Sequence, residues 1–132
     1  MNNDKLLSPF PKELVKKAPA GKFGDYVPHA NYVERLRDSG VQYSWSCEPV
    51  YGTFNGEKRI VGAKGTIAIE GMGKYDGFGD VDTFKLSNSK FNDGSNLKDA
   101  ESDAFKRACM RFGLGVELWT GSKQTEEEAR AE

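Results

Sequence analysis

The sequence has only two cysteines and one histidine among its 132 residues. Cys47 and Cys109 do not form a CxxC pair, and neither lies near His29, so the pattern of a zinc site is missing. Both cysteines fall on apolar stripes, which favours buried free thiols over a disulfide or a metal pair. We therefore expect a reducing compartment, no bound metal and no cofactor.

Long apolar runs and nucleotide-binding motifs are also missing. No stretch approaches the roughly 18 apolar residues of a membrane span, and the N-terminus lacks the apolar core of a secretory signal. No GxxxxGK[ST] run is present, so no ATP-driven motor is expected. Asp76, Asp80 and Asp82 are spaced as Mg²⁺ ligands of a nuclease could be. No lysine or histidine completes a nuclease pattern around them, and we predict that the chain is not an enzyme.

The net charge of −1 hides an uneven distribution. Residues 1–24 carry five lysines against two acids, which predicts a flexible basic arm with a short helix at about 12–18. Residues 121–132 carry four glutamates against two basic residues and have no apolar stripe, which predicts a flexible acidic tail. The sequence thus predicts one domain, residues 25–120, between an arm and a tail.

Residues 26–40 are typical of a helix, with Pro28 in the first turn and Gly40 as its stop. Residues 41–51 alternate between apolar and polar side chains, which predicts a half-buried strand. Asn55-Gly56 predicts a tight turn into a second strand at 59–70. The glycines at 71 and 73 predict a turn into a third strand at about 74–81, followed by an irregular polar stretch to about residue 96.

Residues 97–112 form the clearest predicted element. At 100° per residue the apolar side chains fall within one half of the helical wheel, and Lys106 lies at the centre of the other half. Gly113 stands where a left-handed C-terminal cap is expected. The order of elements predicts an α+β fold: a helix, a three-stranded antiparallel meander, and a long helix packed on the sheet.

The segment GluSerAspAlaPheLysArgAlaCysMetArgPheGlyLeuGly at 101–115 resembles the signature helix of the Rad-fifty-two superfamily of single-strand annealing proteins. Two further segments resemble that group, SerTrpSer at 44–46 and TyrAspGlyPheGly at 75–79, and the resemblance extends from about Tyr26 to Leu118. It implies a β-β-β-α core, ring or filament oligomers, and ATP-independent annealing of single-stranded DNA in recombination and repair. It also implies a cytoplasmic protein of a bacterial or phage-infected cell that meets other recombination proteins and no membrane.

The resemblance assigns DNA contact to Lys106 and Arg107, which match the basic pair of the signature helix. Met110 stands where the family has a further arginine, and Arg111 follows one place later. Asn31 also replaces a basic residue of the family's entry helix. The site expected from the sequence therefore draws on additional basic side chains, and its full set is Lys106, Arg107, Arg111, Lys64, Lys98 and Lys90.

Elementary physics agrees with such a site, because lysine and arginine on a rigid helix bind phosphates without reading base edges. Alternatives stay open for single residues: Arg107 is spaced to pair with Asp103, Trp45 suits a core, and Phe78 suits either a groove or a subunit contact. We expect Leu118 and Trp119, with the sheet edges, to contact a neighbouring subunit; the alternative is that these two side chains fold back under their own sheet. Two other functions fit the order of elements, a double-stranded RNA-binding module and a structural oligomer subunit without nucleic acid.

Overall fold

The computed structural model describes residues 3–17 and 25–118. The chain divides into two compact units. The sheet unit is Gln42–Phe112, and the helical unit combines Met1–Val41 with Gly113–Glu132. Among the described residues, no helix combines the length and the apolar character that crossing a membrane requires.

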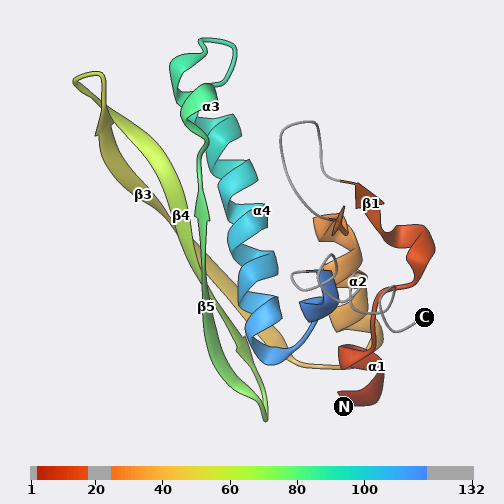
Figure 1. Cartoon of the computed structure of the whole chain (residues 1–132). Helices are drawn as coiled ribbons and strands as arrows, with labels where there is room; N and C mark the ends of the chain where they lie inside the picture. The colour runs from red at the N-terminus through yellow and green to blue at the C-terminus, as the bar shows by residue number, and fades with distance from the viewer. Residues whose placement is uncertain (1–2, 18–24, 119–132) are drawn as a thin grey trace, which may run out of the picture. The chain divides into compact units, whose positions relative to one another are not determined.

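The sheet unit is a three-stranded antiparallel meander with a long helix on one face (Figure 1). Its strands are β3 (Tyr43–Phe54), β4 (Glu57–Ile69) and β5 (Gly73–Asp80), and β4 is the central strand. A short helix, α3 (Thr83–Ser87), precedes the long helix α4 (Asp93–Phe112). The predicted α+β fold with a helix packed on a meander is confirmed.

Both predicted turns of the meander are present. Asn55 and Gly56 have φ of 51° and 79°, the pair of positive values that a type I′ hairpin turn requires. Gly71 and Gly73 also have positive φ, and the amide of Met72 donates to the carbonyl oxygen of Ile69. The pairing of β3 with β4 shifts between Val50 and Tyr51. The residues next to the turn, from Tyr51 to Ile60, therefore pair in a different register from the rest of the hairpin.

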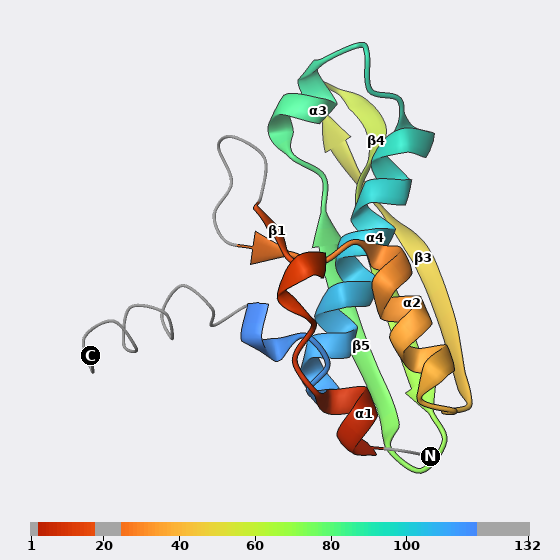
Figure 2. The same ribbon diagram turned by 90° about the vertical axis from the view of Figure 1, so that its right-hand side faces the viewer.

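One face of the sheet packs on α4 and forms the core of the unit. Trp45 on β3 meets Phe105 edge to face, with ring centroids 5.0 Å apart. Tyr75 on β5 meets Phe112, with centroids 5.5 Å apart. Ile67 on β4, which pairs with both Trp45 and Tyr75, is completely buried. The opposite face is not covered by any helix within the described part of this unit (Figures 1 and 2).

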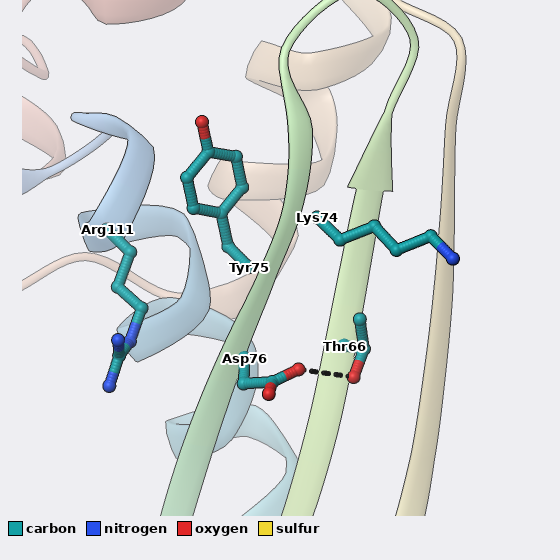
Figure 3. Close-up of a pocket in the computed structure, with 5 residues that line it drawn as sticks. All are labelled: Thr66, Lys74, Tyr75, Asp76 and Arg111. Atoms are coloured by element: carbon teal, nitrogen blue, oxygen red, sulfur yellow. Dashed lines mark hydrogen bonds between the residues drawn. The ribbon is translucent and has the colours of Figure 1, made fainter.

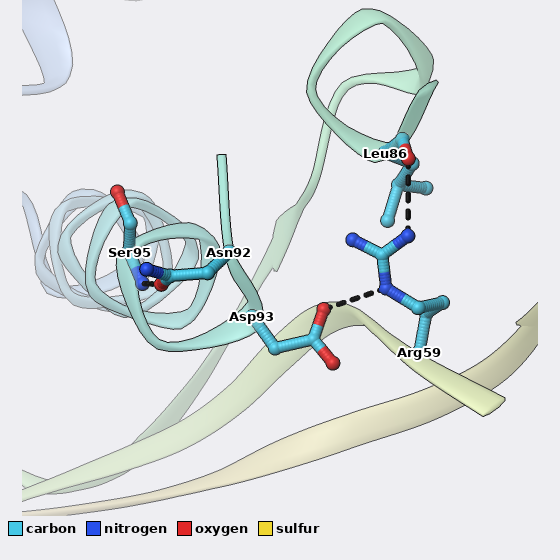
Figure 4. A network of polar contacts seen from close by, with 5 residues as sticks. All are labelled: Arg59, Leu86, Asn92, Asp93 and Ser95. Carbon is cyan, nitrogen blue, oxygen red and sulfur yellow. Dashed lines mark hydrogen bonds and ion pairs between the residues drawn. The ribbon is translucent and has the colours of Figure 1, made fainter. Parts of the chain in front are cut away.

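Helix α4 begins at Asp93, four residues before the predicted start at Leu97. The apolar stripe does not reach this first turn, which is fixed by polar contacts instead (Figure 4). The side-chain oxygen of Asn92 accepts from the amide of Ser95 at 2.8 Å. Asp93 accepts from Nε of Arg59 at 2.8 Å, and Arg59 also donates to the carbonyl oxygen of Leu86. Arg59 thus ties β4 to both helices.

In the helical unit, α2 (His29–Asp38) confirms the first predicted helix, which begins three residues later than expected. The prediction of a helix at 12–18 is wrong. Residues 12–14 form one 3-10 turn, and β1 (Lys16–Lys17) then pairs with β2 (Asp25–Tyr26). Val15 has extended backbone angles, which end the turn.

The N-terminal residues are held by contacts within the helical unit. The first helix, α1 (Asn3–Leu7), carries the buried Leu6. Arg35 on α2 donates to the carbonyl oxygens of Leu6 and Ser8, and its guanidinium lies 4.6 Å from the ring centre of Phe10. The part of the expected arm that the structure describes is therefore folded. Residues 18–24, Trp119 and the predicted tail at 121–132 lie outside the described residues.

Candidate nucleic-acid interface

The sheet unit has no net charge to attract a polyanion as a whole. Residues 42–112 contain ten Lys and Arg residues and ten Asp and Glu residues. Binding of phosphate must therefore depend on where individual cations lie.

Arg107 and Arg111 are exposed and lie one turn apart on the same flank of α4. Arg107 forms the ion pair with Asp103 that the spacing of the two residues allows, since its Nε donates to a carboxylate oxygen of Asp103 at 3.1 Å. This pair is open to solvent, with about half of the Arg107 side chain exposed. Exposed pairs of this spacing contribute only about 0.3–0.5 kcal/mol. A phosphate can therefore replace Asp103 as the partner of Arg107 at little cost.

Arg111 also lines an open cavity beside the edge strand β5 (Figure 3). The other lining residues are Thr66 on β4 and the β5 residues Lys74, Tyr75 and Asp76. Tyr75 points toward α4, where it meets Phe112, and its hydroxyl donates to the carbonyl oxygen of Met72 at 2.7 Å. Figure 3 shows Arg111 and Lys74 on opposite sides of β5. Lys74 thus lies on the face of the sheet opposite α4 and borders the cavity across the edge strand from Arg111.

Asp76, the acidic residue that lines this cavity, accepts a hydrogen bond from a threonine hydroxyl group. Thr66 Oγ1 and a carboxylate oxygen of Asp76 are 2.6 Å apart in a hydrogen bond across β4 and β5. Asp82 precedes α3, and Asp80 ends β5. The described residues contain no group of three or more metal-ligating side chains close enough to hold an ion.

Lys106, which the helical wheel places at the centre of the polar half of α4, is less accessible than its neighbours. It is half-buried, whereas Arg107 and Arg111 are exposed. Burial lowers the pKa of Lys106, and the nearby Asp103 carboxylate opposes this effect. A helical wheel could not show this, because it takes account only of the helix itself. Of the two residues of the basic pair, Arg107 is the one more accessible to a phosphate.

Lys64 lies on the other face of the sheet from α4. It pairs across the strands with Glu48 on β3 and with Phe78 on β5. Its ammonium group is 5.9 Å from the centre of the Phe78 ring, and 51% of Phe78 is exposed. Lys64 and the basic flank of α4 are therefore not parts of one contiguous groove.

The last two candidates are also separate from Arg107 and Arg111. Lys98 is exposed and precedes Arg107 by nine residues, which places it about 180° away around the helix. Lys90 is exposed in the connection before α4, and the first residue of that helix, Asp93, is about 27 Å from Arg111 at 1.5 Å per helical residue. The six predicted residues are thus spread over both flanks and one end of α4 and over the far face of the sheet.

Both thiols are free. Cys109 on α4 is fully buried, and Cys47 on β3 is partly exposed. Burial raises the pKa of both thiols, and for Cys47 the neighbouring Glu101 carboxylate raises it further. Raised pKa values disfavour the thiolate, so neither cysteine has the environment of a nucleophile.

Comparisons of the chain with protein-family models, with curated proteins and with solved structures gave no match. The resemblance to annealing proteins thus stays a prediction from the sequence. The site predicted from the sequence did not include Lys74, which lines the cavity beside Arg111. The signal for it is the alternation of β5, in which Lys74, Asp76 and Phe78 share one face of the strand.

Proposed function

We propose that this protein binds single-stranded DNA and anneals complementary strands without nucleotide hydrolysis, in homologous recombination or DNA repair. The observation that carries the proposal is the flank of α4 beside β5. It presents Arg107 and Arg111 one turn apart, with Lys74 on the other side of the edge strand. Cations fixed on a helix attract phosphates and leave base edges available to a second strand.

The resemblance of residues 101–115 to annealing proteins supports the same proposal, because it falls on the helix that carries these arginines. Such a mechanism needs no cofactor. It needs a strand held by its backbone and a second strand that can pair with it. The basic surface is small, so affinity from one copy is limited, and several copies along a strand supply the rest.

We infer further that the protein acts as a homo-oligomer, a ring or a filament. Within the described residues the sheet has two edge strands, β3 and β5. An open edge is normally covered, charged or paired with another chain. Heterologous contacts between copies close into rings or continue as filaments, according to the rotation per subunit.

The proposal is tested with the double variant Arg107→Gln and Arg111→Gln. Removing two phosphate contacts lowers the slope of log affinity against log salt by about 1.4, since each contact on a single strand contributes about 0.7. At about 0.1 M salt the affinity for a mixed-sequence strand falls roughly 10- to 30-fold. Annealing of complementary labelled strands, measured without ATP, slows with it.

The control is Arg37→Gln combined with Lys12→Gln, which changes the net charge equally at exposed positions in the helical unit. Its affinity stays within about twofold of wild type. Equal losses in both double variants would mean that only total charge matters. A wild-type protein that binds no single strand, or that prefers double-stranded RNA, would overturn the proposed function.

A further inference from the structure

Phe78 is an exposed aromatic residue on β5 that stands between two glycines packed closely against α4. Its neighbours Gly77 and Gly79 face α4, and a side-chain carbon on either one would overlap a helix carbonyl oxygen, of Ala104 or Ala100 respectively. The strand is therefore in direct contact with the helix backbone on both sides of Phe78. The Phe78 ring points the other way, to the uncovered face, and is 51% exposed.

The surroundings of Phe78 are polar. The residues that pair across this face within the regular register are Ser44, Ser46, Glu48 and Val50 on β3, Gly62, Lys64, Thr66 and Ala68 on β4, and Lys74, Asp76 and Asp80 on β5. A stable protein interface buries about 800 Å² on each partner, with an apolar centre. The other exposed large apolar residue of this face in the regular register, Val50, is on β3, and β4 lies between it and Phe78, so the two do not provide such a centre. A second protein copy is therefore a poor fit to this face.

A single aromatic ring beside a cation does fit one nucleotide. An exposed ring offers a stacking surface to any base, and stacking leaves the pairing edge of the base open. The ammonium group of Lys64, 5.9 Å from the ring centre, lies within reach of the phosphate of a stacked nucleotide. Lys74, four residues from Phe78 on the same face, lies about 13 Å away along the strand.

The acidic residues on this face limit its electrostatic attraction for a nucleic acid. Glu48, Asp76 and Asp80 outnumber Lys64 and Lys74, so the face has no surplus of positive charge. Attraction here must come from the ring, with Lys64 as a local phosphate contact. This distinguishes the face from the flank of α4, where the contacts are with phosphates alone.

We propose that Phe78 is a base-stacking residue and that Lys64 holds the phosphate of the stacked nucleotide. This inference rests on the proposed binding of single-stranded DNA and assigns a second kind of contact to it. In this arrangement the DNA strand contacts the sheet unit on two faces. Its phosphates bind along α4, and one of its bases stacks on the uncovered side of β5.

The experiment compares two strands of equal length, a mixed-sequence oligonucleotide and an abasic deoxyribose-phosphate strand. For Phe78→Leu, which keeps an apolar side chain without the ring, affinity for the mixed-sequence strand falls about 5-fold to 100-fold. Affinity for the abasic strand stays within twofold, and the salt slope is unchanged. Phe78→Tyr, which keeps the ring, binds both strands as the wild type does. Lys64→Gln weakens both strands and lowers the slope by about 0.7.

Equal effects of Phe78→Leu on the two strands, or no effect on either, would overturn the stacking role. A smaller particle in light scattering for Phe78→Leu without DNA would make Phe78 a subunit contact and would also overturn it. Failure of the wild type to bind either strand refutes the proposed function instead. Because Phe78 is exposed, its variants should keep the wild-type melting temperature within a few degrees, and circular dichroism checks this.

Discussion

Gly77 lies directly against the backbone of α4, so that a side-chain carbon built on it overlaps the carbonyl oxygen of Ala104 and comes within 2.7 Å of the Ala108 amide nitrogen. Gly79 stands in the same relation to Ala100, one helical turn earlier. The alanines spaced four apart on α4 and the glycines spaced two apart on β5 together allow helix and strand to approach closely. This explains why the sequence TyrAspGlyPheGly needs glycine at these two places.

The first prediction concerns this close approach. Gly77→Ala should lower the free energy of unfolding by about 3 kcal/mol or more, because the added carbon meets rigid backbone instead of a movable side chain. Urea denaturation measures the change. The matched control is Gly94→Ala in the first turn of the same helix, where the nearest atom is the Asn92 side-chain oxygen at 3.4 Å. That variant should be as stable as wild type or more stable by up to about 1 kcal/mol. A Gly77→Ala protein of wild-type stability would show that α4 does not contact β5 in this way.

The second prediction concerns Trp45, whose ring covers Gly65 and meets Phe105. Its Nε1 donates to a carboxylate oxygen of Glu101 at 3.0 Å. Trp45→Phe should destabilise the protein by about 1–2 kcal/mol, because it loses this charge-assisted hydrogen bond and part of the contact area. Trp45→Ala should cost about 3 kcal/mol or more. Glu101→Gln keeps an oxygen acceptor and should cost less than Trp45→Phe. Denaturation curves that place all three variants within 0.5 kcal/mol of wild type would contradict a packing role for Trp45.

Much of the fold follows from local patterns in the sequence. The alternation of β3, the Asn55-Gly56 turn and the apolar stripe of α4 each depend on neighbouring residues, and each is confirmed. The first turn of α4 was missed because Asn92 and Asp93 fix it through hydrogen bonds, one of them to Arg59, which is distant in sequence. No periodicity of side chains signals such a contact. The helix expected at 12–18 is only a turn at 12–14, because none of these three residues is buried and the chain then enters β1, which pairs with β2.

The candidate site was less predictable than the fold. The sequence shows which residues are basic, but it does not show which of them share a surface. Lys64 and Arg107 are on elements that pack together, yet the alternation of β4 directs Lys64 away from α4. The half-burial of Lys106 depends on tertiary contacts that a helical wheel cannot represent. Lys74 joins Arg111 only because β5 is the edge strand beside that flank of the helix.

The third prediction follows from the lowered pKa of Lys106. On unfolding, this pKa returns to its ordinary value of about 10.4. Between the two values the unfolded chain binds a proton that the folded chain lacks, so the contribution of Lys106 to stability rises with pH across this window. It falls as the pH drops through the lower, folded value. The stability of wild type relative to Lys106→Met should therefore increase from pH 8 to pH 10.5 in urea denaturation.

The last prediction concerns the two thiols. Cys109 is fully buried and its pKa is raised well above the ordinary value by desolvation, so it should not react with a disulfide reagent at pH 8 until the protein unfolds. Cys47 is partly exposed, and its pKa is raised first by burial and then by Glu101, so it should react, but more slowly than a free thiol. Its rate should climb with pH as the thiolate fraction grows. Glu101→Gln removes one of the charges that oppose the thiolate and should speed the reaction of Cys47. Cys47→Ser should leave no thiol that reacts without denaturant. Two thiols that react quickly in the folded wild type would contradict the burial of the Cys109 side chain.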